Sequence, residues 1–180
     1  MKYFVLLVIT CLLFQSCAEP EAAQTKHYFD LKGLIDAQIK QLDAHKKRVQ
    51  KTITVDGQAE TKQLDELDWA KELELFQQAD LNKAAYKQSY VVVENDSSIL
   101  YTLKPTEKVA IKKLAIFKNQ GQVIRIEAQL EEKNYLYHSQ KNLEAHFSKG
   151  LIDSYRIEGF QQLVLGNKKA YSIVGRIQHD

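Results

Sequence analysis

The sequence predicts an α+β fold, in which two helices pack on an antiparallel β-meander of about seven strands, together with an N-terminal β-hairpin. Two observations carry this prediction. Apolar residues recur at helical spacing in the first half of the chain, whereas after Ser89 they gather in short runs typical of strands. Short polar turns separate those runs, and such turns connect antiparallel neighbours. We therefore expect both helices on one face of the sheet.

The first helix is expected from about Tyr28 to His45 because one apolar stripe recurs every three or four residues. The stripe consists of Tyr28, Leu31, Ile35, Ile39 and Leu42. Apolar and polar residues then alternate from Val49 to Val55. Asp56-Gly57 follows, and both residues tolerate the positive φ of a two-residue hairpin turn. The polar segment Gln58 to Leu64 is the predicted return strand of an edge hairpin.

The second helix is expected to begin after Asp65, whose carboxylate can cap the free N–H groups of the first turn. Leu64 and Trp69 have the spacing of a hydrophobic staple. The helix should end near Asp80 to Asn82. Its predicted buried stripe is Trp69, Leu73 and Phe76.

Seven apolar runs predict the strands of the meander. They lie at 90–93, 99–103, 109–117, 123–130, 135–147, 155–165 and 170–177. Lys112-Lys113 interrupts the alternation of the third run, which indicates a β-bulge.

The chain begins with Met1-Lys2 and an apolar run from Tyr3 to Phe14, the order of a secretory signal. The run is shorter than the about 20 residues that cross a bilayer. Two processing sites remain open. Ser16-Cys17-Ala18 suits a general signal peptidase, which would remove Cys17. The stretch "FQSC" resembles instead a relaxed bacterial lipobox of the Bacteroidota lipoproteins, although Phe14 and Gln15 depart from the strict form.

The resemblance to bacterial lipoproteins implies that Cys17 is acylated, with palmitate or a similar chain, and becomes the mature N-terminus. The domain boundaries are then 1–16 for the signal peptide, 17–26 for a lipidated tether and 27–180 for a single α+β domain. The implied location is the cell envelope, on the periplasmic or the surface face of the outer membrane. The implied partners are the membrane itself and another envelope protein.

The chain lacks the motif spacings of hydrolases, zinc enzymes and phosphate-binding loops, so we expect neither an enzyme nor a cofactor. It has no basic run with interleaved aromatics, and nucleic acid is not an expected partner. His138, Glu144 and His146 were considered as metal ligands. Along one strand the two histidines would lie about 26 Å apart, too far for one ion. No metal site is predicted.

Tyr135, Tyr137 and Phe147 share the odd-numbered face of one predicted strand. This face is either sheet core or the lining of a pocket for an apolar ligand. The first alternative predicts a non-catalytic protein-binding or accessory module. The second predicts a carrier or sensor of a lipid or acyl chain, because a curled sheet plugged by helices resembles the half-barrel carriers of the lipoprotein-sorting pathway. Whether a small molecule binds stays open.

Overall fold

The computed structural model describes residues 26–178, so the signal segment, Cys17 and most of the predicted tether lie outside the described residues. The helices are α2 (Leu31–Ala44), α3 (Trp69–Glu72), α4 (Glu74–Gln78) and the 3-10 turn η2 (Ala84–Tyr86). The strands are β1 (Val49–Val55), β2 (Gln58–Leu64), β3 (Tyr90–Asn95), β4 (Ser98–Leu103), β5 (Ile111–Asn119), β6 (Gln122–Lys133), β7 (Tyr137–Ser148), β8 (Leu151–Leu163) and β9 (Lys169–Ile177).

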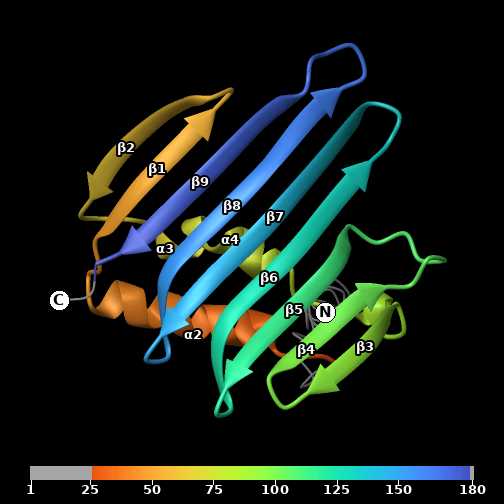
Figure 1. Cartoon of the computed structure of the whole chain (residues 1–180), viewed down its shortest axis with the longest axis horizontal. Coiled ribbons are helices and arrows are strands. Elements are labelled where there is room, and N and C mark those ends of the chain that lie inside the picture. The colour runs from red at the N-terminus through yellow and green to blue at the C-terminus, as the bar shows by residue number, and fades with distance from the viewer. Residues whose placement is uncertain (1–25, 179–180) are drawn as a thin grey trace, which may run out of the picture.

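All nine strands belong to one antiparallel sheet with the order β2-β1-β9-β8-β7-β6-β5-β4-β3 (Figure 1). Strands β3 to β9 form an uninterrupted meander. The hairpin β1–β2 adds to its far end, where Val49 pairs with Ile177 and Val55 with Tyr171. The predicted α+β fold, with a hairpin, a seven-stranded meander and helices on one face, is therefore confirmed. The pairing of β1 with β9 leaves β2 and β3 as the two edges of the sheet.

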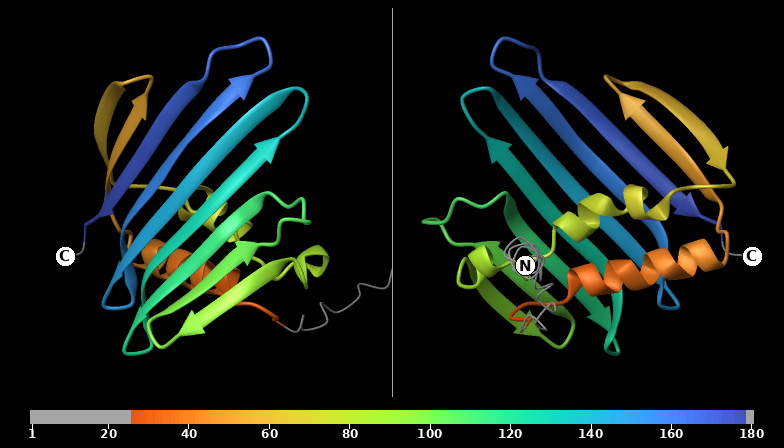
Figure 2. Two further views of the ribbon diagram at one scale, coloured as in Figure 1. Left: turned by 45° about the vertical axis from the view of Figure 1, so that its right-hand side comes forward. Right: turned by 180° about the vertical axis from the view of Figure 1, so that it is seen from behind.

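The helices α2, α3 and α4 lie across one face of the sheet (Figure 2, right). The other face, called the open face below, carries no helix from residues 26–178. Apolar side chains from the helices and the sheet are buried between the two layers, and they include the predicted stripes of both helices. The largest fully buried ones are Trp69, Tyr155, Phe76, Leu31, Ile35 and Leu42. Strands β6 to β9 continue well beyond the helices toward their turns (Figure 1).

The helix boundaries differ from those predicted, and capping explains the difference. The first helix begins at Leu31 because the carboxylate of Asp30 accepts the N–H of Gly33 at 3.0 Å. The second helix is broken at Leu73, and its N-cap is Asp68, which accepts the N–H of Lys71 at 3.0 Å. The prediction of Asp65 as the cap, with its staple, is therefore wrong. Leu64 is the last residue of β2, so the helix starts several residues later.

The local features of the sheet follow the sequence closely. Asp56 and Gly57 both have positive φ, at 49° and 86°, and make the predicted turn between β1 and β2. The register between β5 and β6 shifts between Ile111 and Lys113, which confirms the predicted bulge. A further shift between His146 and Phe147 was not predicted.

Candidate interaction surface

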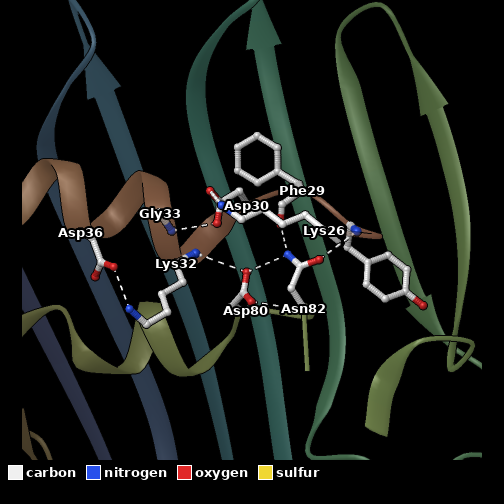
Figure 3. A network of polar contacts seen from close by, with 9 residues as sticks. Lys26, Phe29, Asp30, Lys32, Gly33, Asp36, Asp80 and Asn82 are labelled. Carbon is white, nitrogen blue, oxygen red and sulfur yellow. Dashed lines mark hydrogen bonds and ion pairs between the residues drawn. The ribbon is translucent and has the colours of Figure 1, made fainter. Parts of the chain in front are cut away.

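A buried polar network joins the start of α2 to the segment after α4 (Figure 3). Asp80 is only 7% exposed, and its carboxylate accepts the N–H of Lys32 at 3.3 Å and the N–H of Asn82 at 2.9 Å. Asn82 in turn accepts the N–H of Tyr28 and donates to the carbonyl of Phe29, both at 3.0 Å. These groups satisfy backbone donors and acceptors that the helix terminus leaves unpaired. We interpret the network as structural.

Asp36 connects α2 to α4. Its carboxylate accepts hydrogen bonds from Lys32 Nζ at 2.7 Å and from Gln77 Nε2 at 2.6 Å. The hydrogen bond from Lys32 is the largest influence on Asp36 and lowers its pKa, with Gln77 adding to the effect against partial burial. Asp36 therefore stays ionised at neutral pH and helps to dock the two helices.

A second buried cluster fixes α3 to the sheet. Lys51, Gly175 and Tyr155 are neighbours across β1, β9 and β8. One oxygen of Glu72 accepts the Tyr155 hydroxyl at 2.6 Å, and the other pairs with Lys51 Nζ at 2.6 Å. The side chains of Lys51 and Glu72 are 16% and 10% exposed. Burial, followed by the contact with Glu72, raises the pKa of Tyr155 far above its usual range. Both carboxylate oxygens are engaged, so this cluster is also structural.

The structure does not bring the three predicted face residues together. Phe147 lies in the core at 8% exposure, whereas Tyr135 lies in the β6–β7 turn at 83%. Strand β7 begins only at Tyr137, because the side chain of Asn134 accepts two backbone N–H groups and closes a turn there. Tyr137 is half-buried and donates to Glu132 at 2.6 Å, a hydrogen bond that raises the pKa of its hydroxyl. The odd-numbered face of β7 is therefore sheet core at Leu143, Ala145 and Phe147, and Tyr135 lies outside the strand.

The histidines that were considered as metal ligands lie on the open face, each beside a carboxylate. His138 Nε2 is 3.0 Å from a carboxylate oxygen of Glu131, and His146 Nε2 is 2.7 Å from one of Glu144. Within residues 26–178, no three His, Cys, Asp or Glu side chains come close enough to share a metal ion. Cys17, the predicted lipidation site, falls outside this range.

The open face is a polar surface with shallow depressions between its strands. The residues that line the central depression include Lys113, Glu127, Asn142, Glu144, Arg156 and Glu158. Opposite charges on it are paired, with Arg156 2.8 Å from Glu158 and Arg125 Nε 3.2 Å from Glu127. Arg125 also lies over the Phe117 ring at 4.1 Å. Such mixed, paired charges are typical of a solvated sheet face.

The two edges of the sheet differ sharply in chemistry. Strand β2 is polar along its length, and its exposed Glu60 and Lys62 form an ion pair at 2.8 Å. Strand β3 instead exposes three successive valines: Val91 at 51%, Val92 at 45% and Val93 at 58%. The sequence shows this run as a strand without alternation, but its position at an edge follows only from the order of the sheet. We identify β3 as the candidate interaction surface.

Comparisons of the chain with protein-family models, with curated proteins and with solved structures found no match. Within residues 26–178, no helix combines the length and hydropathy needed to cross a bilayer. The proposals below therefore rest on the chemistry and geometry of the chain itself.

Proposed function

We propose that this protein is a membrane-anchored, non-catalytic protein-binding module of the bacterial cell envelope. Its binding site is the edge strand β3, which takes an extended segment of a partner protein as an additional strand. The observation that carries the proposal is the run of three exposed valines on β3, an edge strand whose one charged side chain is Glu94.

An edge strand presents unpaired N–H and C=O groups, and natural proteins protect such edges with charged side chains, proline or bulges. Strand β2 has this protection in Glu60 and Lys62. Successive side chains of a strand point to opposite faces, so Val91, Val92 and Val93 place apolar surface on both sides of β3. A partner strand would pair with the backbone and cover the valines with its own apolar side chains, as in β-strand addition.

The structure supports β3 from beneath with packed tyrosines. The Tyr28 ring packs edge-to-face against the rings of Tyr90 at 5.7 Å and Tyr101 at 5.5 Å. The Tyr90 hydroxyl, at the first residue of β3, donates to the carbonyl of Ile111 at 2.9 Å. A strand fixed in this way loses little conformational freedom when a partner pairs with it, which favours binding.

The proposed anchor is an acyl chain on Cys17. A lipid at this position would keep the domain close to other envelope proteins and so raise the effective concentration of a partner. Intact-mass measurement of protein purified from its native membranes would reveal acylation at Cys17. A mature chain that begins after Ala18 would contradict it.

The carrier interpretation has less support. Side chains between the helices and the sheet, such as Leu31, Phe76 and Ile126, are fully buried. The depression at the centre of the open face is lined mostly by polar and charged residues rather than by apolar ones. An apolar ligand would need the latter.

Site-specific photocrosslinking in the native membrane tests the proposed edge. A photoreactive amino acid at Val92 should give an adduct of one discrete mass, and the same residue at Ala59 on β2 should give none. Adding Val93→Lys beside the probe should abolish the adduct, because a buried, unpaired charge opposes strand pairing. An adduct of twice the mass of the chain would identify a second copy as the partner. Equal labelling at both edges, or none at either, would refute β3 as the binding site.

A further inference from the structure

Two hairpin turns meet at the end of the sheet that extends past the helices. The backbone N–H of Val164, after β8, donates to the carbonyl of Leu136, before β7, at 2.9 Å. The two turns together expose five large apolar side chains, called the tip cluster below. They are Tyr135 (83% exposed), Leu136 (56%), Leu163 (58%), Val164 (68%) and Leu165 (99%). The turns project from the longest strands of the sheet (Figures 1 and 2).

Three lysines lie close to the tip cluster in sequence, and Glu132, beside Lys133, is the nearest acidic residue. The lysines between 133 and 136 and between 160 and 171 are Lys133, Lys168 and Lys169, and neither segment contains an acidic residue. Lys168 Nζ lies 3.8 Å above the ring of Phe160, so its ammonium group makes a cation–π contact beside the tip cluster.

The nearest acidic groups lie to the side of the tip cluster. Glu131 and Glu132 are further back along β6, where they contact His138 and the Tyr137 hydroxyl. Asp56 lies in the neighbouring β1–β2 turn, whose backbone pairs with Ala170. The outermost surface is therefore apolar with a basic margin.

We propose that the tip cluster inserts into the surface of a bilayer that contains anionic lipids. The apolar side chains form a projection rather than a groove, and a fluid acyl layer can close around a projection of any shape. Tyrosine and lysine at its margin suit the boundary between acyl chains and headgroups. Lys133, Lys168 and Lys169 at this margin provide the attraction to anionic headgroups, while Glu131 and Glu132 lie further back and contact His138 and Tyr137.

The geometry allows the tips and the proposed lipid to enter the same bilayer, a point that rests on the proposed acylation of Cys17. The chain enters the domain beside Tyr101, whose hydroxyl accepts the N–H of Phe29 at 3.0 Å. Tyr101 on β4 pairs with Leu114 on β5, which pairs with Ala128 on β6, so the three residues lie in one row across the sheet. From Ala128 to Asn134 is about 20 Å along the strand. The nine residues 17–25 can span at most about 30 Å.

Tryptophan placed at the tip tests the insertion directly. The full-length protein carrying Tyr135→Trp is reconstituted into vesicles of phosphatidylethanolamine and brominated phosphatidylglycerol, which quench only tryptophans at acyl depth. We expect a blue-shifted emission from position 135 that is strongly quenched. Native protein, whose Trp69 is 2% exposed in the core, should be unaffected. The matched control Ser148→Trp lies at the last residue of β7, at the end of the strand opposite to the tips, and should also be unaffected.

Charge variants separate an anionic surface from any apolar surface. Lys168→Gln and Lys169→Gln should each lower the ratio of inserted to free tips about fivefold, because one lysine near an anionic bilayer contributes about a factor of five in affinity. Leu165→Asp should abolish quenching at position 135. Equal quenching in vesicles of brominated phosphatidylcholine would overturn the assignment of anionic lipid. No quenching in either vesicle would overturn membrane insertion, and crosslinking at Val92 would still report on the β3 site independently.

Discussion

The two flanks of the sheet are held to the helix side of the molecule by different kinds of contact. The charged flank, formed by β2, β1, β9 and β8, is fixed to α3 by the buried cluster of Lys51, Glu72 and Tyr155. The tyrosine flank, formed by β3 and β4, is fixed by the packed rings of Tyr28, Tyr90 and Tyr101. Each anchor lies beneath the sheet and therefore leaves the outer edge free to differ.

The edges themselves differ in what they allow to approach. On β2, exposed charged side chains oppose pairing with another strand. On β3, the middle of the strand consists of three valines, with Glu94 as the one charged residue, and a strand that approaches the valines gains apolar contact on both faces. Both edges of the sheet have unpaired backbone groups, so position alone does not decide whether another strand can add to them. The side chains decide it: those of β2 oppose pairing and those of β3 favour it.

The largest effect is expected at the anchor of the charged flank. A methyl group at Gly175 would collide with the ring of Tyr155, so Gly175→Ala should lower the free energy of unfolding by about 3 kcal/mol. Urea unfolding followed by the fluorescence of Trp69 measures this. The control Gly166→Ala, whose methyl would lie 3.4 Å from Leu163 Cβ, should change stability by about 0.5 kcal/mol or less. Similar losses in both variants would mean that the Tyr155 ring does not rest on Gly175.

The next largest effect is the loss of folding stability at high pH, to which the buried tyrosines of both flanks contribute. Burial raises the pKa of Tyr90 and Tyr101 on the tyrosine flank and of Tyr155 on the charged flank above the ordinary value of 10.0. Above pH 10 these tyrosines lose protons in the unfolded chain but keep them in the folded one. Stability is therefore complete below pH 10 and falls as the pH rises, by up to about 1.4 kcal/mol per pH unit per tyrosine.

Phenylalanine variants assign this pH dependence to the flanks. The double variant Tyr90→Phe, Tyr101→Phe should remove more of the slope than Tyr155→Phe, measured by urea unfolding at a series of pH values from 9 upward. A slope that is unchanged by the double variant would show that the tyrosine flank ionises freely and is not closely packed.

Substitutions on the two edge strands should have the smallest effect on stability but a clear effect on association between copies of the protein. Val92→Lys on β3 and Lys62→Val on β2 should each change the free energy of unfolding by about 0.5 kcal/mol or less, since both side chains are largely exposed. Sedimentation should show that Lys62→Val promotes association and that Val92→Lys does not. Association of the Val92→Lys variant alone would reverse the assigned roles of the two edges.

Local features of the fold were predictable because neighbouring residues determine them. The stripe of α2, the buried set Trp69, Leu73 and Phe76, and the strands of the meander all follow from apolar spacing. The turn at Asp56-Gly57 follows from backbone preferences. The bulge at Lys112-Lys113 follows from a break in alternation.

The cap of the second helix was less predictable, because Asp65 and Asp68 both have the right side chain. The choice depends on where β2 ends, and β2 ends at Leu64 because it pairs with β1 over its whole length. The start of β7 was less predictable for a similar reason. Alternation continues through Tyr135 in the sequence, but the side chain of Asn134 turns the chain before the strand begins.

The sequence by itself determined the periodicity of each element, the positions of most turns and the absence of familiar catalytic motifs. Only the tertiary structure decided that β1 pairs with β9, that β2 and β3 are the edges, and that Leu136 and Val164 lie side by side. The physical reason is that strand pairing depends on backbone hydrogen bonds and register between distant segments, which local side-chain spacing does not specify. The interaction surfaces of this protein arise from that pairing.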